Sequence, residues 1–399
     1  MPYYIGDVIK EAEGLVARTP EEFAASGIHV HLKTAVEAIE PDRGVVRTSN
    51  GKSVAYDTLV VATGTRAVMP GIPGENLEGI FVLKNLSDGI GIKTWLEKRQ
   101  CKKAVIVGAG FIGMELAEAF RMRGIDTTVV HRGTLPVNRW DDELSRYALD
   151  ELLRHDVSFI METMPRAVEK ESDGRLRLLT TDGELTADII IFGLGVRPET
   201  TLAAEAGLAL GSSGALKVNF SQRTAREEIF AAGDCAEVFH RISKEWINVP
   251  LGDVANKQGR VAGSTIGGYP MRFPGVVGAQ SFKLFGLELA ATGIDESEAR
   301  KSGYDPVSNI TWETFSSPTM AGRTRMGLKL TADRFTGQLL GAQAASNGGA
   351  VGRINTLSAC LWAGMDLDEI GYLDFAYSPP YGGAWDIIHR AAQTLKRKL

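Results

Sequence analysis

The sequence predicts an α/β protein with two related strand–turn–helix domains, the first of them incomplete, and a C-terminal α+β domain. Three observations support this prediction. A β-branched run passes through a glycine-rich turn into a helix pattern at 102–120. Residues 56–66 share their pattern with residues 187–197. The stretch 271–399 alternates strand patterns with helix patterns.

The composition is typical of a globular protein of two or three domains, with 399 residues, 44% of them hydrophobic, and a net charge of −5. The absence of a basic run argues against nucleic acid as a partner. No apolar stretch approaches the roughly 20 residues of a membrane span, and the sequence predicts no secretory signal. Cys101, Cys235 and Cys360 lie far apart, which fits a reducing cytoplasm and predicts neither disulfides nor a metal site.

The strongest motif is KKAVIVGAGFIGMELAEAF, residues 102–120. Gly108 suits the tight turn, Gly110 allows the backbone to approach a pyrophosphate, and Gly113 allows the helix to lie close to the strand. The N-terminus of the helix would face the phosphates with its N–H groups. A second strand pattern, DTTVVHR, follows at 126–132, so the stretch predicts a Rossmann-type dinucleotide site.

The end of that second strand predicts which nucleotide is preferred. An NAD site usually places Asp or Glu there, whereas this chain has His131 and Arg132. A guanidinium can bind a 2′-phosphate through two hydrogen bonds, so NADPH is expected in preference to NADH, with NADH possible. The alternative is that Arg132 is a solvated loop residue.

An internal repeat indicates two related dinucleotide domains. In YDTLVVATGTR (56–66) and ADIIIFGLGVR (187–197), Asp57 matches Asp188, Gly64 matches Gly195 and Arg66 matches Arg197. The repeat predicts a glycine fingerprint in the first domain as well, and its place would fall before Met1. We therefore expect the first domain to lack its opening strand, phosphate-binding turn and helix. The 399-residue chain should for that reason hold FAD poorly. Chance similarity between two apolar strands that end in glycine is the alternative.

Four motifs resemble the FAD-dependent pyridine nucleotide-disulfide oxidoreductases, and most closely their coenzyme A disulfide reductase and NADH oxidase/peroxidase branch. They are VVATGTRAVMPGIPG (60–74), VGAGFIGMELAEA (107–119), TAREEIFAAGDCAEV (224–238) and NVPLGDVANKQGRVAG (248–263). The stretch from FPGVVGAQSFKLFG to YSPPYGGAWD resembles the dimerisation domain of that family. The resemblance implies a homodimer that passes electrons from NAD(P)H through FAD to a small disulfide or persulfide.

The resemblance also implies what precedes the chain. In the family, a segment similar to Cys-Gly-Leu-Pro-Tyr-Tyr carries the redox cysteine. The chain begins Met-Pro-Tyr-Tyr, so Met1 stands where the leucine would be. The redox cysteine would then lie two positions before Met1, and Tyr3 and Tyr4 would follow it near the substrate. The three cysteines within the chain are expected to be structural, so no catalytic residue is assigned.

Other site residues are implied by the same resemblance. Phe111 would gate the nicotinamide and Glu115 would lie near its contact with the flavin, although both could be ordinary helix residues. Asn256 would contact flavin or substrate with Lys257, the alternative being a helix cap beside a solvated lysine. Asp234 would bind ribitol or ribose hydroxyls of FAD, or else cap the next helix. The full cofactor-binding set is Ala62, Thr63, Gly64, Arg66, Gly108, Gly110, Phe111, Ile112, Gly113, Glu115, His131, Arg132, Gly195, Gly233, Asp234 and Tyr377.

One departure from the family concerns the substrate. Coenzyme A disulfide reductases share a tyrosine near the active site of the partner subunit, and Ser317 stands at that place in this chain. Tyr377 fits the second aromatic position of the family pattern. Coenzyme A disulfide is therefore in doubt, and a persulfide, another disulfide or oxygen stay open. The predicted domains are FAD-binding (1–98 and 219–270), NAD(P)H-binding (99–218) and dimerisation (271–399). The alternatives are a non-catalytic NADPH-binding dimer and a cysteine-independent NAD(P)H oxidase.

Overall fold

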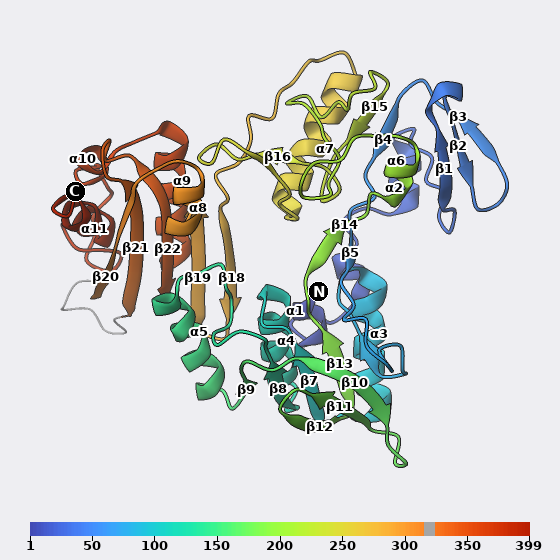
Figure 1. The fold of residues 1–399 in the computed structure, drawn as a ribbon, viewed down its shortest axis with the longest axis horizontal. Coiled ribbons are helices and arrows are strands. Elements are labelled where there is room, and N and C mark those ends of the chain that lie inside the picture. The colour runs from blue at the N-terminus through green and yellow to red at the C-terminus, as the bar shows by residue number, and fades with distance from the viewer. Residues whose placement is uncertain (315–323) are drawn as a thin grey trace. The chain divides into compact units, whose positions relative to one another are not determined.

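A computed structural model describes residues 1–314 and 324–399 (Figure 1). The chain forms two compact units, each built from separate stretches. Unit 1 comprises Met1–Lys10, Val68–Gly195 and Val277–Leu399, and unit 2 comprises Glu11–Ala67 and Val196–Val276. Residues 1–10 and 68–98 thus lie in unit 1, although we predicted 1–98 as one FAD-binding stretch. Compactness does not say which cofactor a residue contacts, so the domain boundaries stay a prediction.

A five-stranded parallel sheet forms the nucleotide-binding fold of unit 1, with strand order β6-β13-β7-β8-β9. Its strands are β6 (Ile80–Phe81), β7 (Lys103–Val107), β8 (Asp126–Val130), β9 (Ser158–Ile160) and β13 (Ile189–Phe192), and its helices are α3 (Leu86–Arg99), α4 (Phe111–Met122) and α5 (Asp142–Arg154). The strand sequences KAVIV and IIIF are almost continuously apolar because both faces of a parallel sheet are buried.

A three-stranded antiparallel sheet extends this fold, formed by β10 (Pro165–Lys170), β11 (Leu176–Thr180) and β12 (Gly183–Ala187). Its residues Val168 and Leu178 share one core with Val107 and Phe192 of the parallel sheet. The two sheets therefore stabilise one another.

The C-terminal part of unit 1 is built on a five-stranded antiparallel sheet, with order β18-β19-β22-β21-β20. The strands are β18 (Gln280–Leu284), β19 (Leu287–Gly293), β20 (Pro306–Thr314), β21 (Arg325–Asp333) and β22 (Leu339–Ser346), and the helices are α8 (Glu296–Lys301), α9 (Ala350–Ala363), α10 (Leu367–Ile370) and α11 (Ile387–Lys396). Strand β22 is buried along its whole length because α9 and α5 both pack against it. The α/β class and the C-terminal α+β region are thus as predicted.

The first ten residues dock on the nucleotide-binding fold. Helix α1 (Pro2–Ile5) packs against α3 and α4, and Ile5 is fully buried. Asp7 then binds Lys93 Nζ through Oδ1 at 2.8 Å and Arg123 Nη1 through Oδ2 at 2.7 Å. Because the hydrogen bond from Lys93 and the charge of Arg123 favour the carboxylate, the pKa of Asp7 is lowered.

Unit 2 consists of short sheets packed on small hydrophobic clusters, one around Ile229 and Ala231 and another around Val254 and Val261. Its strands are β1 (Val36–Glu40), β2 (Val45–Thr48), β3 (Ser53–Ala55), β4 (Leu59–Val61), β5 (Thr65–Ala67), β14 (Val196–Pro198), β15 (Ile229–Ala231), β16 (Val238–Phe239) and β17 (Trp246–Ile247). Its helices are α2 (Pro20–Ala25), α6 (Thr201–Glu205) and α7 (Gly252–Ile266), with 3-10 turns at Ala12–Leu15 and Pro41–Arg43. Strands β4 and β15 pair in parallel, and β5 pairs antiparallel with β14.

The sequence repeat is visible as a repeated backbone path. Strand β4 leads through Gly64 into β5, and β13 leads through Gly195 into β14. Both glycines have positive φ, at 69° and 92°. Among the described helices, none combines the length and the apolar character needed to cross a membrane.

We expect Asp7→Asn to lower the free energy of unfolding by about 1–2 kcal/mol at pH 7, since it removes a charge-assisted contact to the buried Lys93. Asp7 has a φ of 62°, a conformation that asparagine also tolerates. Because the pKa of Asp7 is lowered on folding, its contribution is present above its ordinary pKa of about 4 and is lost as the pH falls below it. Urea unfolding at pH 7 and pH 3 measures both effects.

The control is Asp42→Asn, which removes an ion pair of an 86% exposed carboxylate with Arg226. Its effect should stay within about 0.5 kcal/mol. Equal stabilities for the two variants at pH 7 would contradict the role given to Asp7.

Candidate nucleotide-binding site

The turn between β7 and α4 has the geometry that a dinucleotide requires. A Cβ on Gly108 would lie 2.3 Å from the carbonyl oxygen of Gly193, and one on Gly113 would lie 2.2 Å from the carbonyl oxygen of Gly108. A Cβ on Gly110 would meet nothing within 4 Å. The first two glycines are therefore needed for packing, whereas Gly110 borders open space at the start of α4. These residues fit a nicotinamide nucleotide pyrophosphate there.

His131 and Arg132 lie at the carboxyl end of β8, beside β9. The backbone of His131 is held on both sides, by its N–H to Ile160 and by its carbonyl to the N–H of Thr163. Burial, and then the charge of Arg132, lower the pKa of His131, so this ring is neutral at pH 7. Arg132 is exposed, and no carboxylate of the described residues is paired with it. The guanidinium is therefore accessible to an anionic ligand.

Glu115 lies one turn into α4, close to the amino group of Met1. Burial raises its pKa, the Met1 amine opposes that rise, and Glu118 adds to it. Tyr3 faces the same charges, and its pKa is raised by burial and by Glu115. Tyr4 lies instead in the core beneath Lys93, whose Nζ is 4.3 Å from the ring centroid. Of the two tyrosines predicted near the substrate, Tyr3 is thus the accessible one.

A second cluster forms in unit 2, where β4 and β15 end side by side. Ala62, Thr63 and Gly64 follow β4, and Gly233 and Asp234 follow β15. Because paired parallel strands end at the same edge, Thr65 Oγ1 donates to Asp234 Oδ2 at 3.2 Å. A Cβ on Gly64 would meet nothing within 4 Å, so this edge fits close approach of a flavin cofactor.

Two polar residues that sequence reasoning missed hold this edge in place. Gln258, which is 1% exposed, accepts the N–H of Gly233 at 2.9 Å and donates to the carbonyl oxygen of Glu237. Asn248 donates to the carbonyl oxygen of Asp234 at 2.8 Å. The sequence offers one indication of the role of Gln258: it is a polar residue that follows the apolar spacing of 248–263.

Asn256 and Lys257 lie on the exposed side of α7. Asn256 is not its N-cap, since α7 begins at Gly252, so the helix-cap alternative is wrong. Lys257 pairs with Asp253 at 2.8 Å one turn earlier.

Ile112 is exposed on the first turn of α4, next to Phe111. Ser317 lies outside the described residues.

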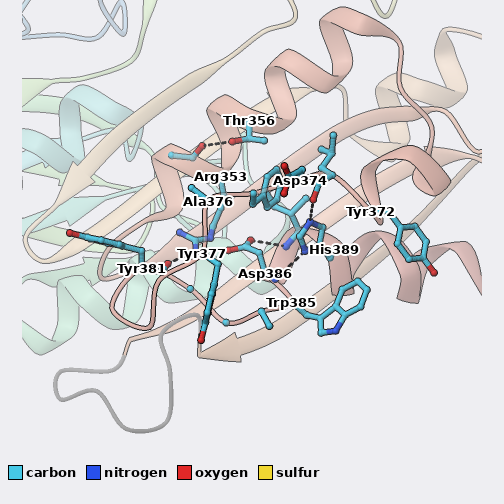
Figure 2. A pocket seen from close by; sticks show the side chains of 17 residues that line it. Arg353, Thr356, Tyr372, Asp374, Ala376, Tyr377, Tyr381, Trp385, Asp386 and His389 are labelled. Carbon is cyan, nitrogen blue, oxygen red and sulfur yellow. Dashed lines mark hydrogen bonds and ion pairs between the residues drawn. The ribbon is translucent and has the colours of Figure 1, made fainter.

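Tyr377 lies at a cavity of about 440 Å³ in the C-terminal part. Arg353 and Asp386 form an ion pair at 2.6 Å in its wall. Figure 2 shows the rings of Tyr377 and Tyr381 pointing away from this pair, and they are 61% and 76% exposed. Tyr377 therefore belongs to an exposed aromatic surface and is far along the chain from either cofactor motif.

Comparison with known proteins identifies the family. The family model described as pyridine nucleotide-disulphide oxidoreductase matches residues 4–259, and that of its dimerisation domain matches residues 279–387. This chain belongs to the pyridine nucleotide-disulphide oxidoreductase family. The enzyme class, the use of FAD and NAD(P)H, and the C-terminal dimerisation domain predicted from the motifs are therefore confirmed. The contacts of individual residues with the cofactors stay predictions.

Relatives within the pyridine nucleotide-disulphide oxidoreductases differ in their named activities. The NAD(P)H coenzyme A polysulfide/persulfide reductase of Pyrococcus horikoshii is 35% identical over 98% of this chain and 88% of its own length. An NADH oxidase of Enterococcus faecalis is 30% identical over 98% of this chain and 88% of its own length. The structure of an NAD-dependent persulfide reductase from A. fulgidus superposes with a TM-score of 0.95 at 32% identity, covering 100% of this chain and 75% of that one.

The cysteines of this oxidoreductase are all buried. Cys235 is fully buried, and its thiol contacts the carbonyl oxygen of Val61 at 3.4 Å. Burial raises the pKa of Cys101 to about 11 and also raises that of Cys360. Since the thiolate is the nucleophile, these environments suit structural cysteines. The glycine fingerprint and redox cysteine expected ahead of Met1 concern residues outside this chain and stay a prediction.

The glycine geometry predicts different effects at two positions of one motif. Gly110→Ala should change the free energy of unfolding by less than about 1 kcal/mol, because its Cβ would enter open space. It should weaken NADPH binding roughly tenfold or more, because the Cβ would stand where the pyrophosphate approaches. Gly113→Ala should instead cost about 1–3 kcal/mol of stability through its clash with the Gly108 carbonyl oxygen.

Thermal unfolding and calorimetric titration with NADPH measure the two quantities separately. A Gly110→Ala protein that binds NADPH like the wild type would show that this turn does not receive the pyrophosphate.

Proposed function

We propose that this protein is an NADPH-dependent flavoenzyme that reduces a small persulfide or disulfide. The observation that supports this acceptor class is the 35% identity, over nearly the whole chain, to a protein named for polysulfide and persulfide reduction. For a persulfide the balanced reaction is R–S–SH + NADPH + H⁺ → R–SH + H₂S + NADP⁺. The S–S bond is broken by the two electrons of the nicotinamide.

The residues of unit 1 would bind and orient NADPH. The start of α4 at Gly110 would receive the pyrophosphate through backbone N–H groups, and Arg132 would bind the 2′-phosphate. Glu115, half-buried and with a raised pKa, is a carboxyl group that can hold a proton beside Tyr3. In unit 2, Gly64 and Asp234 would hold FAD at the edge formed by β4 and β15. FAD bound there would supply the redox chemistry that connects the two-electron donor NADPH with the acceptor.

A second candidate is an oxidase that passes the electrons to oxygen. The 30% identity to the NADH oxidase of Enterococcus faecalis supports it, as do the three buried thiols. A non-catalytic NADPH-binding protein is the remaining candidate. Coenzyme A disulfide receives less support because Ser317 stands where a tyrosine is expected.

Parallel anaerobic and aerobic assays with the purified protein, incubated with excess FAD, distinguish these candidates. NADPH oxidation that depends on added coenzyme A persulfide and releases sulfide would support the proposal. Oxidation that needs only dissolved oxygen would favour the oxidase. Failure of the protein to acquire flavin absorbance after reconstitution, with NADPH still bound, would favour the non-catalytic protein.

The choice of nucleotide can be tested at Arg132. Arg132→Glu should weaken NADPH binding by on the order of 1–3 kcal/mol, about 5- to 150-fold, and change NADH binding little. The change removes a charge-assisted contact with the 2′-phosphate and adds repulsion. Arg166→Glu is the control, since it reverses the charge of an exposed arginine on β10 of the same unit. Equal losses for the two nucleotides would show that Arg132 does not contact the 2′-phosphate.

We also propose that the C-terminal domain forms a homodimer in which Tyr377 lies near the flavin of the partner subunit. Tyr377, Tyr381 and Trp385 are exposed within one short segment, and aromatic residues are enriched at interfaces. Sedimentation should give a dimer at micromolar concentration. The double change Tyr377→Ser with Tyr381→Ser should shift it toward monomer, while Tyr269→Ser, a 77% exposed tyrosine of unit 2, should not. A wild-type monomer at that concentration would contradict the proposal.

A further inference from the structure

One strand of the C-terminal sheet lies against the first residue of the nucleotide-binding helix. The ring of Phe111 stacks on Phe282 of β18, with centroids 5.1 Å apart and planes at 27°. Trp140 meets both rings edge-on, 5.5 Å from Phe111 and 5.4 Å from Phe282. The indole is itself fixed, since Nε1 donates to the carbonyl oxygen of Ala290 at 3.0 Å. Phe111, in the nucleotide-binding fold, is therefore supported by the ring of Phe282, which belongs to the C-terminal sheet.

The same strand holds α4 again two turns later. Glu118 accepts a hydrogen bond from Lys283 Nζ at 2.6 Å and another from the N–H of Phe285 at 2.7 Å. Phe111 and Glu118 are seven residues apart, so they lie on one face of the helix. Strand β18 and its turn thus fix both the start and the second turn of that face.

Helix α5 holds the turn that follows β18. Glu151, which is 3% exposed, accepts the N–H of Gly286 at 3.1 Å. The ring of His155 stacks on Phe285 with centroids 3.8 Å apart. Because α5 also binds this turn, the positions of Phe282 and Lys283 beside α4 are fixed by contacts with two helices.

On the basis of the proposed function, we propose that Phe282 and Lys283 are positioning residues for the binding of a nicotinamide dinucleotide. Phe282 acts by holding Phe111 at the start of α4, and Lys283 acts through Glu118. Binding at a helix N-terminus gains affinity when the N–H groups are oriented before the ligand arrives. The C-terminal domain would thereby supply part of the nucleotide site as well as a dimer surface.

The effect should depend on which part of the ligand reaches α4. Loss of an aromatic stack of about 0.5–1.5 kcal/mol should weaken NADPH binding by about 2- to 12-fold. Adenosine 2′-phosphate has no pyrophosphate and would contact only the end of β8, so its affinity should not change. A general loss of folding would weaken both ligands.

Calorimetric titration of Phe282→Leu with NADPH and with adenosine 2′-phosphate tests the proposal. We expect only NADPH to be weakened, and we expect Lys283→Met to act in the same direction and Lys283→Arg to restore the affinity. The control is Tyr147→Leu. It removes a stack on Trp312, at 4.7 Å, that joins α5 to β20 and belongs to neither α4 nor β18, and it should bind both ligands normally.

Unchanged NADPH binding by Phe282→Leu, equal losses for both ligands, or an equal loss in Tyr147→Leu would each overturn the inference. If Phe282→Leu does not fold, Phe282→Met keeps the side-chain volume and gives the same comparison. A wild-type protein that binds neither NADPH nor NADH would overturn the proposed function itself, and this inference with it.

Discussion

The arrangement of unit 1 depends on the close approach of α4 to the turn after β7. There is no room for a Cβ between Gly113 and the Gly108 carbonyl oxygen, or between Gly108 and the Gly193 carbonyl oxygen. Any larger residue would push the helix away from the sheet. The position of the helix axis decides where Phe111, Glu115 and Glu118 project. The glycine contact therefore sets both the phosphate-facing end of α4 and the face that meets the C-terminal sheet.

The face of α4 that meets the C-terminal sheet carries the buried carboxylate of Glu118, whose charge must be neutralised. Burying a carboxylate is costly unless it is paired and hydrogen-bonded. Glu118 and Glu151 each receive a backbone N–H from the turn between β18 and β19, at Phe285 and Gly286. Phe285 has a φ of 49°, which is uncommon for a residue with a side chain. The helices and the turn therefore specify one another, because a shift of either would cost each buried carboxylate the backbone N–H that the turn donates to it.

The sequence predicted the features that are local in the chain. The glycine motif, the second strand with His131 and Arg132, and the burial of Cys235 and Cys360 all depend on residues within a few turns of one another. The sequence did not predict the contact of Lys283 with Glu118, because those residues are 165 positions apart and each is ordinary in its own element. The helix-cap alternative for Asn256 failed because α7 begins at Gly252, a start that apolar periodicity alone does not mark. The different burial of Tyr3 and Tyr4 arises in a four-residue helix too short to show a period.

The internal repeat has a physical basis in the backbone. In both copies an apolar strand must end, turn through a glycine with positive φ and continue as a second strand. The second strands, β5 and β14, pair with each other, with Arg66 opposite Arg197. Like charges in register repel, and Glu199 offsets this through its ion pair with Arg66 at 3.4 Å. Two of the points at which the chain passes from one unit to the other lie next to this strand pair, at Ala67–Val68 and at Gly195–Val196. Of the residues shared by the two copies, the glycines are therefore the ones that the turn requires.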